Sequence, residues 1–188
     1  MRCLICRKWS FRIICKTCQE EFLILKPKIR LVGDIKVYSF YSYEDIAFLL
    51  NTKYYAIGSR VFNILAKKAS VYFSQNLSDS FSEVYGVGID DNPKKGYSHT
   101  GILLKNFSSR IKPIYGELNA RNKIQYAGKS LAFRQNNPKN FSFKVKNRNL
   151  VIFDDIITTG TSILEAKNII EKNNNRVLFA LVLSDASS

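Results

Sequence analysis

Apolar residues recur along this 188-residue chain with two different periods. Spacings of three and four positions, which place apolar side chains on one face of a helix, predict helices over 44–51, 57–77 and 99–107. Runs of alternating or continuous apolar residues, many of them β-branched, predict strands over 35–41, 83–89, 112–117, 141–145, 150–153 and 177–183. A further short helix and a linker are expected over 20–30, where Pro27 ends the pattern.

Strands that alternate with helices predict the α/β fold class. Such a chain forms right-handed crossovers, so we expect a mostly parallel sheet with helices on both faces. We expect this domain to cover residues 27–188, preceded by a small module and linker helix over 1–26. Ligands of open parallel sheets bind at the carboxyl ends of the strands, so the residues that follow each predicted strand are candidates for a site.

The most informative stretch reads LVIFDDIITTGTSILE, from Leu150 to Glu165. An apolar run is followed by two carboxylates, Asp154 and Asp155, and then by a segment of small hydroxyl residues around Gly160. The glycine and hydroxyl residues favour a tight bend that aims backbone N–H groups at one point where a helix begins. A helix N-terminus of this kind attracts an anion such as a phosphate.

Two carboxylates beside a phosphate site are explained if the ligand also carries a sugar. Vicinal sugar hydroxyls donate hydrogen bonds, and a pair of carboxylates accepts them. The pattern therefore predicts a site for a phosphate and a ribose. An alternative reading is that Ser162 and Glu165 only form a capping box, and that the two aspartates are solvated loop residues.

This stretch resembles the motif with which type I phosphoribosyltransferases bind 5-phosphoribosyl 1-pyrophosphate (PRPP). The resemblance implies a type I phosphoribosyltransferase-like fold in which the acidic pair contacts the ribose hydroxyls and the following loop holds the 5′-phosphate. It also implies that Mg²⁺ accompanies PRPP. Carried over by position, the PRPP-binding residues are Asp154, Asp155, Ile156, Thr158, Thr159, Gly160, Thr161 and Ser162.

Two other segments carry charged residues suited to the rest of such a ligand. The loop after the strand over 83–89 and the long stretch over 119–143 are candidates for pyrophosphate and lid contacts, because a sugar pyrophosphate needs basic groups opposite it. A solvated charged turn is the alternative for the first loop. We interpret the single histidine, His99, as structural. The candidate contacts are Asp90, Lys94, Lys95, Arg121 and Lys129.

All four cysteines lie in the first 18 residues with the spacing C-x2-C-x8-C-x2-C. Paired CxxC segments bring four thiolates into a tetrahedron, so Cys3, Cys6, Cys15 and Cys18 are predicted to bind a structural Zn²⁺. Disulfides, which a reducing cytoplasm disfavours, and an iron–sulfur cluster are the alternatives. Between the two pairs, Trp9 either stacks on the bases of a single strand or packs the module against the main domain.

The charge of the chain favours an anionic partner. Lys and Arg number 29 against 15 Asp and Glu, which gives a net charge of +14. Composition alone does not choose between DNA, RNA, an acidic membrane surface and a small phosphorylated ligand. We find neither an apolar run of membrane-spanning length nor the apolar core of a signal peptide, so we expect a cytoplasmic protein.

The cysteine module and the DDIITTGTS segment together resemble the ComF family of competence proteins, in particular the ComFC type. The segment Lys95-Gly96-Tyr97-Ser98-His99 loosely matches an RGFNQ-like element of that family, with His99 in place of its usual glutamine. The loop after the strand over 83–89 departs from the family pattern, because it lacks the prolines and most of the arginines.

The resemblance implies a protein needed for natural transformation, which binds PRPP and handles incoming single-stranded DNA in the cytoplasm. DNA-uptake proteins at the inner membrane would be its partners. The resemblance is compatible both with transfer of a phosphoribosyl group and with binding alone. The alternatives are a metabolic nucleobase phosphoribosyltransferase and a DNA-binding module on an inactive transferase scaffold.

Overall fold

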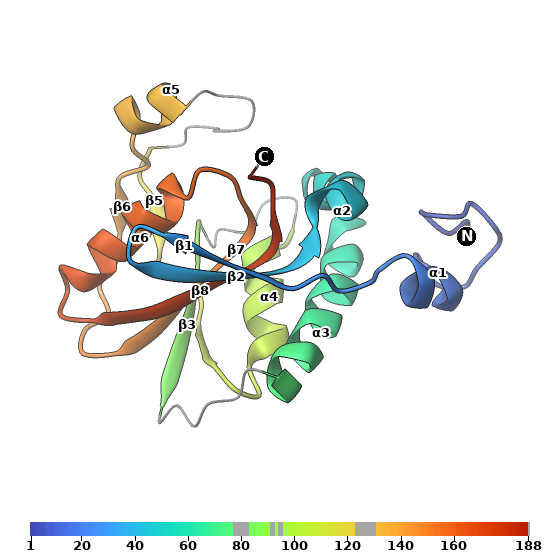
Figure 1. Ribbon diagram of the computed structural model, residues 1–188, viewed down its shortest axis with the longest axis horizontal. Coiled ribbons are helices and arrows are strands. Elements are labelled where there is room, and N and C mark those ends of the chain that lie inside the picture. Colours follow the sequence, from blue (N-terminus) through green and yellow to red (C-terminus); the bar gives the residue numbers. More distant parts are fainter. Residues whose placement is uncertain (77–82, 91–92, 94–95, 123–130, 188) are drawn as a thin grey trace.

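A six-stranded sheet with helices on both faces forms the main body of the protein, as the sequence predicts (Figure 1). The computed structural model describes residues 1–76, 83–90, 93, 96–122 and 131–187. The strand order is β1-β2-β8-β7-β3-β4, and every neighbouring pair is parallel except β1 and β2. These strands are β1 (Lys28–Val32), β2 (Ile35–Ser42), β3 (Val84–Gly88), β4 (Lys112–Ile114), β7 (Asn149–Ile157) and β8 (Arg176–Asp185).

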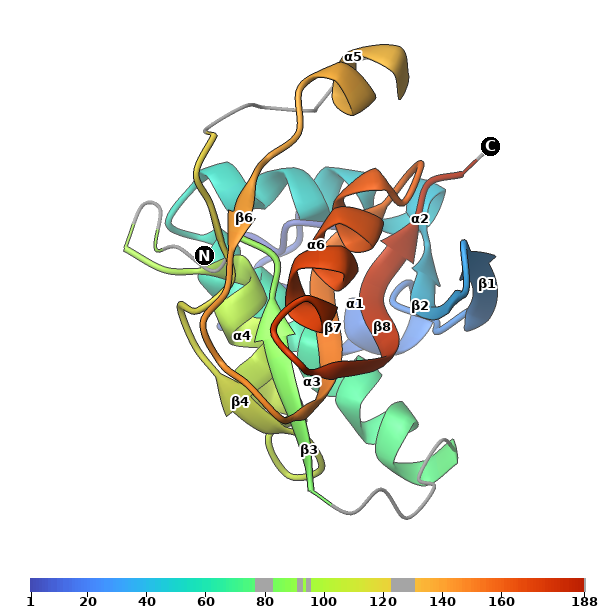
Figure 2. The same cartoon turned by 90° about the vertical axis from the view of Figure 1, so that its left-hand side faces the viewer.

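Helices cover the two faces of this sheet unequally. The helices α2, α3 and α4 pack on one face, while α6 lies over β7 and β8 on the other (Figure 2). The helices are α1 (Lys16–Glu21), α2 (Tyr43–Leu50), α3 (Gly58–Asn76), α4 (His99–Phe107), α5 (Leu131–Asn136) and α6 (Thr161–Glu171), with a short 3₁₀ helix η1 (Asn51–Tyr54) between α2 and α3.

The alternation of side chains along β7 divides the apolar core in two. Val151 and Phe153 face the layer of α2, α3 and α4, whereas Leu150 and Ile152 face α6. All four side chains are fully buried, which explains why this strand is apolar from Leu150 to Phe153, just before its first carboxylate. The central strand is thus fixed from both sides up to the residues that carry charge.

A second, two-stranded sheet closes the base of the long 119–143 segment. Here β5 (Asn119–Ala120) pairs antiparallel with β6 (Phe141–Ser142), and α5 lies beyond the carboxyl ends of the main strands, at the top of Figures 1 and 2. The strand predicted over 141–145 therefore belongs to this small sheet rather than to the main one. Phe141 is buried against the α6 face, which accounts for its apolar character.

Two local predictions are wrong. The helix expected over 20–30 lies earlier, at Lys16–Glu21, because the sulfur of Cys15 accepts the N–H of Cys18 and starts the helix there. Residues 28–30, which the prediction treated as linker, belong to the edge strand β1, in which Ile29 and Leu31 are exposed. Within the described residues, no helix is both long and apolar enough to cross a membrane.

The cysteine-containing segment is packed onto the main body next to α3. Ile14 and Leu23 are buried in the same apolar cluster as Phe40 and Leu65, and the amine of Lys68 donates to the carbonyl of Gln19 at 2.8 Å. This contact is at the far end of the molecule from α6 (Figure 1). The module therefore adds to the core on the α3 side.

Candidate functional site

Asp154 and Asp155 lie within β7, near its carboxyl end, rather than after it. The strand continues through Ile157, because two β-branched residues follow the acids and pair with β8, where Ile156 lies opposite Ser184. Neighbouring strands end at the same edge, since Gly88 of β3 lies opposite Phe153. The two carboxylates thus stand at the carboxyl edge of the central strand.

Asp155 is buried and held by two nitrogen groups on the α3 and α4 side. The Lys53 amine lies 2.7 Å from its Oδ2, and Nε2 of His99 lies 3.8 Å from its Oδ1. Burial alone would raise the pKa of this carboxyl, but the charge of Lys53, with a smaller contribution from His99, outweighs it and lowers the pKa of Asp155 to about 2. Asp155 is therefore ionised and fixed in place.

Asp154 has the opposite environment. Its Oδ1 accepts the backbone N–H of Asp155 at 2.8 Å, and its side chain is half-buried. Burial, followed by the negative charge of Asp155, raises the pKa of Asp154 to about 8. The sequence prediction treated the two acids as equivalent, whereas the structure gives one an ion pair and leaves the other partly exposed with a raised proton affinity.

The position of Lys53 depends on a contact between η1 and the start of α4. The hydroxyl of Tyr97 lies within hydrogen-bond distance of the carbonyls of Lys53, at 3.1 Å, and Tyr55, at 3.2 Å. Burial works against the charged amine, but Asp155 more than compensates and raises the pKa of Lys53. Sequence reasoning missed Lys53, because one lysine in a short polar segment between two helical patterns carries no signal of its own.

The loop after β7 bends sharply at Gly160 to begin α6. Gly160 has φ +81°, and a Cβ added there would lie 2.3 Å from Cγ1 of Val32, so both the backbone conformation and the space require glycine. The hydroxyls of Thr159 and Thr161 are 2.9 Å apart on the outside of this bend. The loop that the sequence predicted to hold a phosphate thus forms a compact turn at a helix N-terminus.

The first turn of α6 has no side-chain cap and contains no acidic residue. The capping-box alternative is not what the structure contains, because Glu165 accepts the backbone N–H groups of Lys139 and Asn140, at 3.1 and 2.6 Å, instead of turning back to the loop. The N-terminus of this 11-residue helix therefore keeps the positive end of its dipole open to an anion.

Of the five residues predicted to contact the pyrophosphate or form a lid, the structure describes Asp90 and Arg121. Asp90 follows β3 at the same edge of the sheet, with φ +51°. Arg121 is exposed at the base of the 119–143 segment, where its N–H donates to the carbonyl of Asn140. Lys94, Lys95 and Lys129 lie outside the described residues. Among the described residues, Lys53 and His99 lie in direct contact with Asp155, and the charge of Lys139 acts on Asp154.

His99 therefore belongs to the site rather than only to the core. Its ring packs edge-on against Phe62, with the centroids 5.8 Å apart. One ligand atom each from His99, Asp154 and Asp155 lies within 4.8 Å of the others, which is close enough to hold a metal ion. Because Lys53 already occupies one oxygen of Asp155, the oxygen donors that remain for a cation are those of Asp154 and Oδ1 of Asp155.

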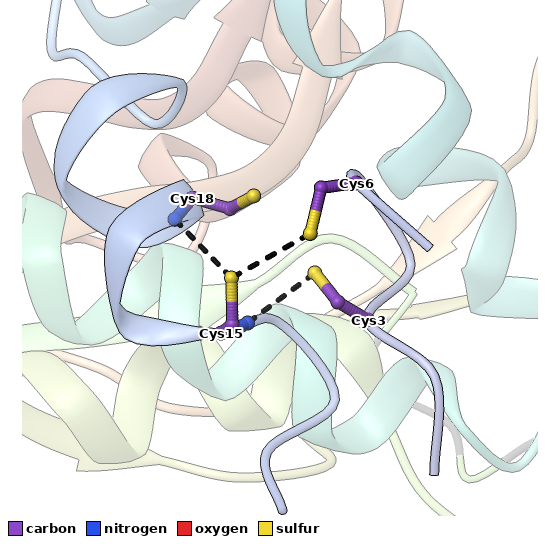
Figure 3. A group of neighbouring side chains, drawn as sticks. All are labelled: Cys3, Cys6, Cys15 and Cys18. Atoms are coloured by element: carbon purple, nitrogen blue, oxygen red, sulfur yellow. Dashed lines mark hydrogen bonds between the residues drawn. The ribbon is translucent and has the colours of Figure 1, made fainter. Parts of the chain in front are cut away.

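The four cysteine sulfurs point to a common centre (Figure 3). They carry no disulfide, and the sulfurs of Cys6 and Cys15 are 3.8 Å apart. A tetrahedral Zn²⁺ with bonds of about 2.3 Å places its sulfurs roughly 3.8 Å from one another, so the spacing fits zinc. The N–H of Cys15 donates to the sulfur of Cys3 at 3.3 Å, which stabilises a thiolate there.

Two aromatic side chains of this module project into solvent. Trp9 is 80% exposed and Phe11 is fully exposed, so neither packs the module against the main domain. Arg7, Lys8 and Arg12 beside them are exposed as well. Of the two interpretations of Trp9, the packing one is therefore wrong, and a surface available to a partner remains.

Comparisons with known proteins give a distant structural similarity. No family model matches the chain, and no curated protein matches it. A crystal structure of an adenine phosphoribosyltransferase is similar over 89% of this chain and 88% of its own, with 15% sequence identity and a TM-score of 0.43. A similarity this distant does not bear on what this chain binds.

Proposed function

We propose that the protein binds PRPP, or a closely related 5-phosphorylated ribose, at the carboxyl end of β7. One observation supports this most directly: the last residues of β7 and one tight turn join the half-buried Asp154 to the uncapped N-terminus of α6. The first accepts hydrogen bonds from sugar hydroxyls, and the second binds an anion. One continuous segment, from Asp154 to the start of α6, thus offers groups for both parts of a sugar phosphate.

The two acids take different parts in this proposal. Asp154 accepts hydrogen bonds from the ribose hydroxyls, while Asp155, pinned by Lys53, holds the end of β7 in register and adds negative charge beside the sugar. The oxygens of Asp154 and Oδ1 of Asp155 suit Mg²⁺, which prefers oxygen ligands. Bound Mg²⁺ would neutralise the pyrophosphate of PRPP. Thr158, Thr159, Gly160, Thr161 and Ser162 would surround the 5′-phosphate.

Transfer of the phosphoribosyl group is the reaction that such a site supports. Pyrophosphate leaves C1 of the ribose as the bond to an acceptor forms, and the sugar becomes positively charged in the transition state. A fixed carboxylate at Asp155 stabilises that charge, and the loop at the helix N-terminus holds the ribose in one orientation.

The binding proposal is tested by thermal unfolding with Mg-PRPP. A ligand present at 100 times its Kd stabilises a folded protein by about 2.7 kcal/mol, which raises the melting temperature measurably. The double substitution Asp154→Ala with Asp155→Ala should remove this shift. Asp45→Ala, which removes an exposed carboxylate at Lys26, is the matched control and should keep it. No stabilisation of the wild-type protein at millimolar Mg-PRPP would refute the proposal.

We further propose a ComF-type role, in which the protein handles single-stranded DNA during natural transformation. The motif resemblance supports it, together with the net charge of +14 and the exposed aromatic and basic side chains of the cysteine module. Stacking on exposed aromatics and contact with a basic surface are how proteins bind single strands without sequence preference.

This second proposal is tested by titrating labelled single-stranded DNA at several salt concentrations. Affinity should fall steeply with salt, and Trp9→Ala should weaken binding by about 1–3 kcal/mol. Tyr115→Ala, at an exposed aromatic far along the chain, is the control. Turnover of PRPP with a free nucleobase, together with no single-strand affinity, would instead favour a metabolic transferase. Single-strand affinity in a protein that does not bind PRPP would favour an inactive scaffold.

A further inference from the structure

The hairpin of β1 and β2 runs alongside the loop and first turns of α6. Four residues of the hairpin meet this segment in chain order: Arg30 at Thr158, Val32 at Gly160, Gly33 at Leu164, and Asp34 at Lys167. None of these contacts follows from the phosphate-loop pattern itself, because the hairpin lies more than a hundred residues earlier in the chain.

Arg30 makes the contact that bears on the loop most directly. Its Nη2 donates to the carbonyl of Thr158 at 2.6 Å, while its Nη1 pairs with Oδ1 of Asp185 at 2.9 Å. The side chain is only 25% exposed, and Asp185 is 9% exposed. A fork of donors held at both tips has one orientation, so the guanidinium fixes the Thr158 carbonyl relative to the end of β8.

The direction of that carbonyl decides what the loop offers to a ligand. In a planar trans peptide, the C=O of one residue and the N–H of the next point in opposite directions. When Arg30 holds the Thr158 carbonyl toward β1, the N–H of Thr159 points away from β1, and the carbonyl oxygen is kept from an anion that it would repel. Val32 supports the next residue, because it fills the space beside the left-handed Gly160.

We propose that Arg30 is a positioning residue of this site, which orients the Thr158–Thr159 peptide for binding a 5′-phosphate through the edge strand β1. The proposal rests on the proposed function, since it assigns the loop the same ligand. The new element of the proposal is that Arg30, outside the motif, sets the affinity for the 5′-phosphate of that ligand. The affinity for the sugar and pyrophosphate parts should not depend on Arg30.

The test compares three ligands on one set of variants by isothermal titration calorimetry. Mg-PRPP and ribose 5-phosphate carry the 5′-phosphate, whereas Mg-pyrophosphate does not. Arg30→Met should weaken the first two by about tenfold, which is the loss expected for one charged hydrogen bond, and leave Mg-pyrophosphate within about twofold. Arg30→Lys, which keeps the charge but not the fork, should fall between Arg30→Met and the wild type.

Lys167→Met is the matched control, because it removes the contact of the same hairpin with α6 at Asp34 without touching the loop. It should bind all three ligands as the wild type does. Equal weakening of all three ligands in Arg30→Met would mean that the residue is only structural, and unchanged affinities would overturn the proposal outright. A wild-type protein that binds none of the three would refute the proposed function instead.

Discussion

Asp154 and Asp155 are sequence neighbours, but the pKa of Asp154 is raised and the pKa of Asp155 is lowered. The difference comes from the pleat of β7, which directs Asp155 to Lys53 and His99 and leaves Asp154 with a half-buried side chain and a negative neighbour. A site of this kind holds one fixed charge and one group whose protonation responds to what binds. The two acids therefore have separate measurable consequences for stability.

Asp154 should make the protein less stable as the pH rises. Its folded pKa of about 8 exceeds the unfolded value of about 3.9, so the stability that its protonated form contributes is complete below that lower value and is lost as the pH rises through 8. Asp154→Asn should therefore gain stability relative to the wild type between pH 5.5 and pH 8.5, measured by urea unfolding. Parallel pH profiles of the two proteins would contradict this assignment.

Asp155 should respond in the opposite sense. Its folded pKa of about 2 lies below the unfolded value of about 3.9, so the stability it contributes is complete above 3.9 and is lost as the pH falls through 2. Lys53→Met should cost roughly 3 kcal/mol in urea unfolding at pH 7, because it removes the positive group that lies nearest to a buried carboxylate.

The control for Lys53 is Lys26→Met, which removes a pair with Asp45 of similar length but much greater exposure. A loss of less than about 1 kcal/mol is expected there, as for other exposed ion pairs. Equal losses of stability in the two variants would contradict the burial of the Lys53–Asp155 ion pair.

At the scale of elements, α6 joins the candidate phosphate loop to the base of the 119–143 segment. Its N-terminus is the turn at Gly160, and one turn later Glu165 receives two backbone N–H groups from the chain that leads into β6. The turn at Gly160 and the chain that leads into β6 are therefore joined through the first turns of one helix.

Gly160→Ala should damage both folding and ligand binding. An L-residue in the left-handed region costs roughly 1–2 kcal/mol, and the added methyl collides with Val32. We expect a loss of at least that size in urea unfolding, together with loss of the Mg-PRPP stabilisation. Gly116→Ala, at φ +69° but with open space around its Cβ, is the control and should leave ligand binding intact.

Glu165→Ala should loosen the base of the 119–143 segment. The N–H groups of Lys139 and Asn140 lose their acceptor, so their amide hydrogens should exchange faster with solvent. Glu171→Ala, at the other end of α6, should leave these two amides unchanged. Unaltered protection in Glu165→Ala would show that the anchoring carboxylate does not hold this segment.

The sequence predicted the elements whose patterns are local and failed where a partner lies far away. The fully apolar run before Asp154 identifies a central strand without any knowledge of the fold, and CxxC spacing identifies the cysteine cluster. Lys53 and Arg30 gave no signal, because their roles depend on residues 102 and 128 positions later. The edge strand β1 was missed for the related reason that its exposed face has no pattern to read.

At the scale of the whole molecule, the cysteine module and the main sheet share one apolar core. Ile14 and Leu23 are as fully buried as the residues of β2 and α3 that they join, so the fold of the module contributes to the stability of the whole chain. A structural zinc site supplies folding free energy only while the metal is bound.

Removal of the metal should therefore destabilise the protein as a unit. We expect about one Zn²⁺ per chain by elemental analysis, as for other four-cysteine sites, and a lower melting temperature after chelation. Cys18→Ser should reproduce the effect. Trp9→Ala, which alters an exposed side chain of the same module, should change stability by no more than about 0.5 kcal/mol. A melting temperature indifferent to chelation would rule out a shared folding unit.

The way β1 meets the α6 loop restricts how the chain can change in evolution. Arg30 and Val32 reach the loop from one side of the strand, while Ile29 and Leu31 point to the other. A single residue gained or lost inside this strand would exchange the two sets, and two isoleucine- or leucine-sized side chains would replace the guanidinium and the valine. Relatives of this protein should accordingly vary in length before Lys28, but inside β1 they should gain or lose only an even number of residues.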